Sequence, residues 1–397
     1  MTITLLFDLD DTLLDTNMDR FIPAYFKALS TALADKVAPE LMLSALMGGT
    51  QAMMTNLDPA ISLREVFDSI FFPKLGLDRS GLQPAIDQFY DEVFPSLGTL
   101  TKPIPAAVTV VDWAFSQGYR VAIATNPLFP LKAVQHRLRW AGLPPERYPF
   151  ALVTSYETCH FMKESIAYYP EVLAQMGWPD DPVVMIGDDI EREVKPTQAA
   201  GLPVFLVRKP GSGSRYPTDV PQGTLDAFPA WLQNTDPETL KVKLQTMPAL
   251  LASLRSTPAA LATLTCPLSE EEWGHRPKPG EWTLTETICH LRDLEREVYL
   301  PRLQKILSEE NPFLADEMTD HWAEERQYSI QNGRQALVDF IVTRKRTLSL
   351  LDNLGLEWSM TARHATFGPT SLLESVSSIA AHDRAHIQQI WKTIRDG

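Results

Sequence analysis

Three short apolar runs in the first half of the chain each end on polar residues that can carry chemistry. The runs and the residues that follow them are 3–7 with Asp8, 121–124 with Thr125, and 183–186 with Gly187-Asp188. Two more short apolar runs are 203–207 and 151–154, and helix-length segments lie between the runs. Continuous apolar runs that alternate with helices indicate a parallel sheet covered on both faces. In such sheets ligands bind at the carboxyl edge, where these polar residues would meet.

Residues 15–100 interrupt this alternation. Phe21, Tyr25, Leu29 and Leu33 recur at spacings of four, and the rest of the segment has similar helical periodicity. We therefore expect a helical insert after the first strand, which would cover the edge of the sheet as a cap.

The sheet pattern stops near residue 232, and we expect no strand from there to 397. The stretch 234–237 (Asn-Thr-Asp-Pro) predicts the start of a helix, because Pro favours the first helical position. Four amphipathic segments of helix length predict a bundle; they are 238–264, 284–308, 333–353 and 371–395. The expected fold is an α/β Rossmann-like core with a helical cap (1–235), followed by an all-α four-helix bundle (236–397).

Asp8 and Asp10 form the sharpest signal in the chain. One carboxylate can attack phosphorus while the other, protonated, delivers a proton to the leaving oxygen. Two acids this close resist joint ionisation unless a cation relieves them, and Asp188 and Asp189 supply further carboxylates for Mg²⁺. Asp8 and Asp10 taken alone could equally be loop or capping residues.

Three residues between these acids could bind a phosphoryl group. Thr125 and Asn126 can donate hydrogen bonds to its oxygens, and Lys163 can neutralise its remaining charge. Their order behind the strands favours a site over isolated loop residues.

The set resembles the haloacid-dehalogenase superfamily of phosphohydrolases over about residues 1–232. The motifs that carry the resemblance are Asp8-x-Asp10-x-Thr12, Thr125-Asn126-Pro127, Lys163, and Gly187-Asp188-Asp189 followed by Glu193. The resemblance implies that Asp8 becomes a phospho-aspartate and that Asp10 is the general acid/base. Since dehalogenating members lack the second Asp, Asp10 implies a phosphatase. Glu164 departs from the family, where Pro usually follows the lysine, and puts a negative charge near the phosphate site.

Three histidines in the second half are spaced for a metal. His382 and His386 are four residues apart, and so project from one face of the last helix. His290 and this pair each lie at the edge of an apolar helical face, so they can converge at the end of a bundle. Three imidazoles suit Zn²⁺, Ni²⁺ or Fe²⁺ and leave positions open for water or substrate. A single histidine at such a place is more often a capping or core residue.

Three neighbours of these histidines have other expected roles. Asp383 lies in the middle of an apolar face and must find a buried partner. Cys289 points away from His290, and we expect it to be a buried core residue and not a metal ligand. His364 is expected in a loop, outside the metal site.

The stretches 280–291 (Gly-Glu-Trp-Thr-Leu onward to His290-Leu291) and 382–390 (His-Asp-x-x-His-x-x-Gln-Ile) resemble the DinB-like metal-binding superfamily. The resemblance covers about 238–397. It implies a four-helix bundle with three histidines on a divalent metal, and some relatives are thiol-dependent transferases.

Charge and composition limit the partners. The net charge of −14 argues against broad binding to nucleic acid or to an anionic membrane. No apolar run approaches the roughly 18 residues of a membrane span, and the first residues do not resemble a signal peptide. Three cysteines without a close pair indicate reduced thiols in a cytoplasmic protein. The oligomeric state is left open, a homodimer included.

We therefore expect a Mg²⁺-dependent phosphatase acting on a small phosphorylated metabolite, with an appended histidine–metal bundle. One alternative is a thiol- or water-dependent transferase centred on the bundle, with the first domain auxiliary. Another is a metal-sensing or scaffold protein.

Overall fold

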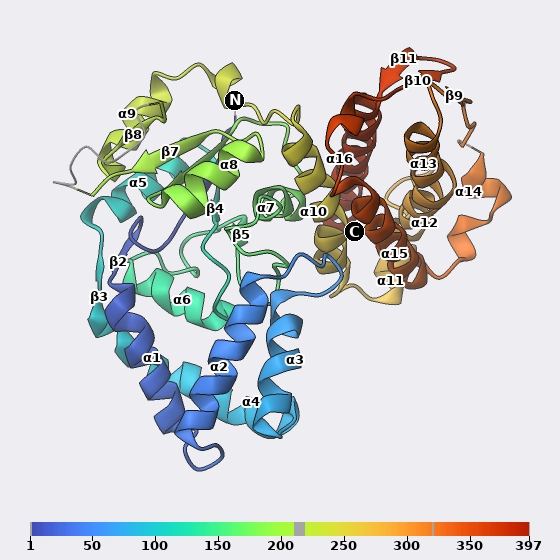
Figure 1. Cartoon of the computed structure of the whole chain (residues 1–397). Helices are drawn as coiled ribbons and strands as arrows, with labels where there is room; N and C mark the ends of the chain where they lie inside the picture. The colour runs from blue at the N-terminus through green and yellow to red at the C-terminus, as the bar shows by residue number, and fades with distance from the viewer. Residues whose placement is uncertain (1, 210–218, 320, 397) are drawn as a thin grey trace. The chain divides into compact units, whose positions relative to one another are not determined.

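The computed structural model describes residues 2–209, 219–319 and 321–396 of the chain. It divides into two compact units, Met1–Tyr168 with Asp180–Val242, and Tyr169–Pro179 with Lys243–Gly397 (Figure 1). The segment 169–179 thus groups with the second unit, although its place in the sequence suggests the first. The bounds of independently folding domains, 1–235 and 236–397, remain a prediction. None of the helices described has both the length and the apolar character needed to cross a membrane.

The first unit is built on a six-stranded parallel sheet with the order β5-β4-β1-β6-β7-β8. Its strands are β1 (Thr4–Phe7), β4 (Arg120–Ile123), β5 (Leu152–Val153), β6 (Val183–Gly187), β7 (Val204–Val207) and β8 (Gln222–Gly223). All five predicted runs form strands, and β8 adds a short edge. Main-chain hydrogen bonds from Asp8 to Ile186 (2.9 Å) and from Ala124 to Phe7 (2.7 Å) join the ends of three strands. These bonds bring the polar residues that follow β1, β4 and β6 to one edge.

Helices pack on this sheet through apolar side chains. In β1, Leu5 and Phe7 belong to a buried cluster that also contains Val110 and Phe228, and the two phenyl rings meet edge to face at 6.0 Å. The helices and helical turns are α5 (Pro105–Ser116), α6 (Leu131–Trp140), η3 (Ile190–Val194), α8 (Lys195–Ala199), η4 (Leu225–Ala227), α9 (Phe228–Gln233) and η5 (Pro237–Leu240).

The insert after β1 is a helical cap, as predicted, but two short strands frame it. β2 (Leu14–Thr16) and β3 (Thr101–Pro103) pair antiparallel where the chain enters and leaves the cap. Strands of three residues are too short to show alternation, so the sequence pattern missed them. The cap consists of α1 (Met18–Ala32), α2 (Pro39–Met54), α3 (Leu63–Leu75), α4 (Arg79–Gln88), η1 (Phe89–Val93) and η2 (Phe94–Leu100).

The second unit contains the predicted bundle (Figure 1). Its elements are α7 (Tyr168–Gln175, which begins in the first unit), α10 (Met247–Thr265), α11 (Glu270–Gly274), α12 (Leu284–Leu294), η6 (Glu295–Tyr299), α13 (Leu300–Ser308), α14 (Trp322–Glu325), η7 (Tyr328–Ile330), α15 (Gly333–Leu351), η8 (Leu356–Ser359) and α16 (Leu372–Asp396). The first predicted helix begins at 247, not at 238. Asp236 and Pro237 do start a helix, but it is only the single turn η5.

The expectation of no strand after residue 232 was wrong. β9 (Phe313–Leu314), β10 (Thr361–His364) and β11 (Gly368–Ser371) form a three-stranded sheet beside the bundle. β10 and β11 are a hairpin whose turn reaches Gly368, and the positive φ of 72° at that position suits glycine. The strands are short, and β11 contains Pro, so neither shows an apolar alternation.

Candidate functional site

Three carboxylates meet at the carboxyl edge of the parallel sheet. Asp8 follows β1, Asp188 follows β6, and Glu193 lies on η3. One oxygen of each lies within 4.8 Å of the others, in the arrangement of a metal site. The three residues line a pocket of about 270 Å³, which we call the acidic pocket.

The amine of Lys163 lies between two of these carboxylates and contacts both. Its Nζ atom lies 2.5 Å from Asp8 Oδ1 and 2.7 Å from Glu193 Oε1, and its side chain is buried. Its main-chain N–H donates to Asn126 Oδ1 (3.2 Å), which ties the loop after β4 to the lysine. One amine thus pairs with two of the three acids.

Burial and nearby negative charges disfavour ionisation of Asp188 and Glu193. Burial, and then the negative charges of Asp8 and Asp11, raise the pKa of Asp188 to about 7. The pKa of Glu193 is raised well above its usual range by burial and by Asp8. Hard oxygen ligands with excess negative charge fit a divalent cation such as Mg²⁺. The residues present therefore suit the predicted metal.

The carboxylates that come together differ from the predicted magnesium ligands. The cluster contains Asp8 and Asp188 with Glu193 in addition, and it does not contain Asp10 or Asp189. The Asp189 carboxylate caps η3 by accepting from the N–H groups of Glu191 (2.8 Å) and Arg192 (3.0 Å). A side chain at the start of a helical turn caps it in this way, so its oxygen is already used.

Gly187 makes room for Glu193. A Cβ atom at Gly187 would lie 1.8 Å from Glu193 Oε2. The same oxygen accepts from the main-chain N–H of Asp189 (2.9 Å). The carboxylate is held from two directions, so a side chain at position 187 would displace it.

Asp10 lines the acidic pocket and pairs with Arg137 of α6. The Arg137 side chain is 1% exposed, whereas that of Asp10 is 20% exposed and so remains accessible from the pocket. The guanidinium packs against the rings of Phe21 (5.5 Å) and Phe129 (5.2 Å). Burial lowers the pKa of Arg137 to about 10, so it stays charged at neutral pH.

Of the three residues predicted to bind phosphate, the structure places two in the pocket. Asn126 and Lys163 line it, whereas Thr125 is buried and is not among the described lining residues. The Thr125 carbonyl accepts from Tyr168 Oη (2.8 Å). The negative charge of Glu164, the residue that departs from the family pattern, is offset by Arg192, whose Nε atom lies 3.1 Å from the Glu164 carboxylate.

The three predicted histidines come together in the second unit. One ring nitrogen from each of His290, His382 and His386 lies within 4.8 Å of the others. The Nε2 atoms of His382 and His386 are 3.1 Å apart. His290 comes from α12 and the other two from α16, so the bundle joins residues nearly 100 positions apart.

These imidazoles are neutral and suited to a metal. Burial, and then the neighbouring histidines, lower the pKa of His290 to about 3. Burial lowers the pKa of His382 to about 3 and also lowers that of His386. In the described structure the buried Nδ1 atoms of His290 and His382 have no hydrogen-bond partner. Neutral imidazoles with unused nitrogens fit a transition metal such as Zn²⁺, Ni²⁺ or Fe²⁺.

Other side chains hold the histidine rings. Trp282 lies 4.9 Å from the His290 ring and almost parallel to His386, and Gln389 Oε1 lies 2.9 Å from His386 Nδ1. Neither Trp282 nor Gln389 was named as a site residue from the sequence.

Asp383 finds the buried partner that the sequence required. Arg344 of α15 pairs with it and also donates to Glu295 Oε2 (2.7 Å), and all three side chains are at most 1% exposed. Cys289 is buried, as expected, and burial raises the pKa of its thiol to about 11. His364 stays outside the histidine cluster, but it lies on β10 and not in a loop.

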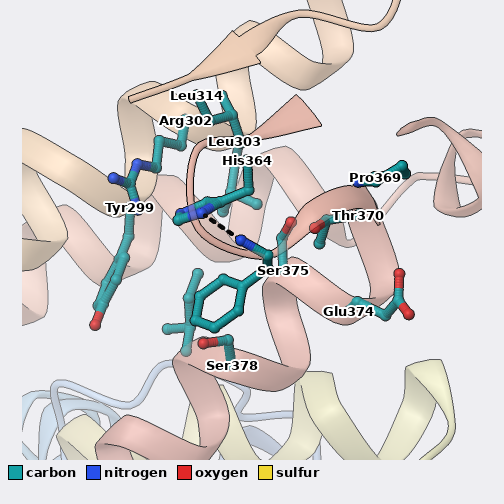
Figure 2. A pocket seen from close by; sticks show the side chains of 12 residues that line it. Tyr299, Arg302, Leu303, Leu314, His364, Pro369, Thr370, Glu374, Ser375 and Ser378 are labelled. Atoms are coloured by element: carbon teal, nitrogen blue, oxygen red, sulfur yellow. Dashed lines mark hydrogen bonds between the residues drawn. The ribbon is translucent and has the colours of Figure 1, made fainter. Parts of the chain in front are cut away.

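A pocket of about 340 Å³ lies in the second unit (Figure 2). Tyr299 and Arg302 line one side, and Ser375 and Ser378 of α16 line another. The Tyr299 ring also meets the His382 ring edge to face at 5.8 Å. One residue that lines the pocket, Tyr299, therefore also contacts the histidine cluster.

Two residues of the first site were not predicted in the places where the structure puts them. Glu193 belongs to the motif that carries the family resemblance, four positions after Asp189, but it was not predicted to join the metal-binding carboxylates. Arg137 carries no local signal, since an arginine in an amphipathic helix is usually exposed.

Two family models match the chain. The model described as haloacid dehalogenase-like hydrolase matches residues 5–207, and the DinB superfamily model matches residues 253–390. A curated protein of Oceanobacillus iheyensis, named as a metal-dependent hydrolase, is 27% identical over 139 residues, which are 34% of this chain and 79% of that protein.

Solved structures show similarity to each part. A 2-haloacid dehalogenase from Pseudomonas syringae is 21% identical, with a TM-score of 0.43, over 59% of this chain and 99% of that one. The four-helix bundle YfiT of Bacillus subtilis is 20% identical, with a TM-score of 0.36, over 39% of this chain and 89% of that one.

Proposed function

Because this chain belongs to the haloacid dehalogenase-like hydrolases and carries a DinB-superfamily segment, we propose that its first unit is a Mg²⁺-dependent phosphatase. Its substrate is a small phosphorylated metabolite, and the reaction passes through a phospho-aspartate at Asp8. The observation that carries this proposal is the presence of Asp10 in the same pocket as the Asp8–Asp188–Glu193 group. Cleavage of a phosphate ester needs a proton for the leaving oxygen, whereas release of a halide does not.

The reaction divides into two steps. In the first, an oxygen of Asp8 attacks phosphorus, the bond to the leaving oxygen breaks, and Asp10 protonates that oxygen. In the second, Asp10 takes a proton from water as the water oxygen attacks phosphorus. The bond to Asp8 then breaks, inorganic phosphate leaves, and Asp8 returns as a carboxylate.

The other residues bind and orient. Lys163 holds the Asp8 carboxylate, and the positive charge of its amine offsets the negative charge of the phosphoryl oxygens. Asn126 can donate to a phosphoryl oxygen. Asp8, Asp188 and Glu193 would hold Mg²⁺, which would supply charge compensation for the acids and the phosphoryl group.

The test compares two reactions on the same purified chain. Hydrolysis of a generic aryl phosphate should require Mg²⁺, and release of chloride from 2-chloropropionate should stay at background. Chloride release without phosphatase activity would assign the site to dehalogenation, and full phosphatase activity in excess chelator would contradict the metal requirement.

A second candidate function rests on the bundle. The histidine cluster contacts Tyr299, which also lines the pocket of about 340 Å³, and a pocket this near the cluster supports a thiol- or water-dependent metal enzyme. Incubation of the metal-loaded chain with a low-molecular-weight thiol and an electrophile tests it. Metal binding without such turnover would instead favour the metal-sensing or scaffold function.

A further inference from the structure

The helical cap contains an apolar cavity of about 260 Å³, which we call the cap pocket. Its walls come from α1, α2 and α3, and side chains that represent them are Phe26, Leu29, Leu46, Phe67, Phe71 and Phe72. An apolar cavity that stays open lowers stability, because the surrounding side chains lose contacts that collapse would provide. A cavity of this kind calls for an occupant.

The cap pocket adjoins the acidic pocket at the sheet edge. Ile22, Leu128 and Phe129 line both of them. Phe129 forms the junction, since its ring meets Tyr25 edge to face at 5.4 Å and supports the guanidinium of Arg137 at 5.2 Å. Arg137 in turn pairs with Asp10, so the cap pocket begins beside the residue that protonates the leaving group.

Four of the six polar side chains that line the cap pocket are paired within the protein, which leaves the hydroxyls of Thr50 and Tyr156 to face an occupant. The Tyr25 and Tyr90 hydroxyls bond each other at 2.8 Å, and Asp68 pairs with Arg79. A further polar lining residue, Gln83, donates to Asp87 (2.9 Å). A sugar in this pocket would lose hydrogen bonds to water without adequate replacement, whereas an apolar group would gain by leaving water.

We propose that the cap pocket binds the apolar leaving group of a phosphate monoester whose phosphoryl group lies at Asp8. This inference rests on the proposed phosphatase function and specifies its substrate class: a monoester of an apolar aromatic or alicyclic alcohol. A dry cavity of about 150 Å³ holds benzene. The cap pocket is larger, at about 260 Å³, and suits a group of about two fused rings.

The test compares substrates that share a primary alkyl phosphate, so that the chemistry of the leaving oxygen is similar. 2-Naphthylmethyl phosphate is compared with glucose 6-phosphate, and acetyl phosphate serves as a small substrate that does not reach the cap pocket. We expect kcat/KM to favour the naphthyl ester by about 100-fold or more, which corresponds to one naphthyl-sized apolar burial. Equal kcat/KM for the two esters, with acetyl phosphate hydrolysed, overturns the inference and leaves the phosphatase function intact. Failure to hydrolyse any of the three overturns both.

Two matched variants test whether the preference for the naphthyl ester arises in the cap pocket. Leu46→Trp fills the cap pocket, whereas Leu43→Trp adds the same side chain at an exposed position of the same helix. We expect Leu46→Trp to lower the ratio of kcat/KM for the naphthyl ester to kcat/KM for acetyl phosphate by at least about tenfold, with the ratio unchanged in Leu43→Trp. An unchanged preference in folded Leu46→Trp overturns the inference.

Product inhibition of the wild-type chain decides the matter if Leu46→Trp does not fold. 2-Naphthalenemethanol should inhibit hydrolysis competitively at concentrations where glucose has no effect. Equal inhibition, or none, by the two alcohols overturns the inference.

Discussion

The guanidinium of Arg137 lies buried on α6 and pairs with Asp10, although the two residues are 127 positions apart in the sequence. Because Phe21 and Phe129 pack against the guanidinium, Arg137 can hold the Asp10 carboxylate in one orientation. Arg137 is therefore a positioning residue for the proton transfer that we propose for Asp10.

Replacement of Arg137 by Met should keep the buried packing and release Asp10. Misplacement of a reacting group by about 1 Å can cost about 100-fold, so we expect kcat to fall by one to two orders of magnitude. The loss should be larger for alkyl phosphates than for p-nitrophenyl phosphate, because good leaving groups need little proton help. A purely structural role would lower both rates equally. Arg139→Met, at an exposed position of the same helix, is the control.

The double variant Arg137→Met/Asp10→Asn tests whether Arg137 affects the reaction by orienting Asp10 or by another route. If Arg137 acts through Asp10, the second substitution should add little to the loss caused by Asp10→Asn alone. Additive losses would mean that Arg137 acts on the reaction by another route.

Asp8→Asn should abolish hydrolysis of an aryl phosphate. The amide is a far poorer nucleophile and a weaker ligand for Mg²⁺, so both roles of Asp8 fail together. Phosphate release is measured with and without Mg²⁺, and Asp15→Asn, an exposed acid nearby, should retain activity. Full activity of Asp8→Asn would remove the reaction from this site.

Gly187→Ala should weaken the magnesium site without unfolding the sheet. The new methyl would displace the Glu193 carboxylate, whose Oε2 atom would lie 1.8 Å from the added Cβ. We expect the Mg²⁺ concentration for half-maximal activity to rise by about tenfold or more, as for loss of a partner that orients metal ligands. Gly274→Ala, where an added Cβ meets nothing within 4 Å, is the control. An unchanged Mg²⁺ dependence would show that Glu193 is not a ligand.

The bundle should bind about one transition-metal ion per chain through its three neutral imidazoles. Alanine at His290, His382 or His386 should sharply lower occupancy in elemental analysis of protein purified without an affinity tag. His364→Ala removes a histidine outside the cluster and should keep the metal. Undiminished metal in His382→Ala/His386→Ala would mean that the ligands lie elsewhere.

Arg344→Met should destabilise the bundle, because it leaves Glu295 and Asp383 buried without their cation. Loss of one partner of a buried ion pair typically lowers the free energy of unfolding by about 3–5 kcal/mol. Urea denaturation measures the effect, with Arg346→Met, exposed on the same helix, as the control. Replacement of all three charged residues by Met, Leu and Leu should recover most of the loss. No recovery would show that the charges themselves stabilise the fold.

The sequence alone determined the parts whose signal is local. Apolar runs identified β1, β4, β6 and β7 because a strand buried on both faces must be apolar throughout. Asp8 and Asp188 could be placed at one edge because parallel strands end together. The spacing of His382 and His386 placed both on one helix face.

Tertiary structure alone decided which side chains became partners. The pairing of Asp10 with Arg137, the cap pocket at Phe129 and the capping role of Asp189 depend on packing. β10 and β11 likewise owe their form to pairing with each other and not to an apolar pattern. The physical reason is that periodicity reports which face of an element is buried, whereas a contact between distant segments depends on how those faces meet in space.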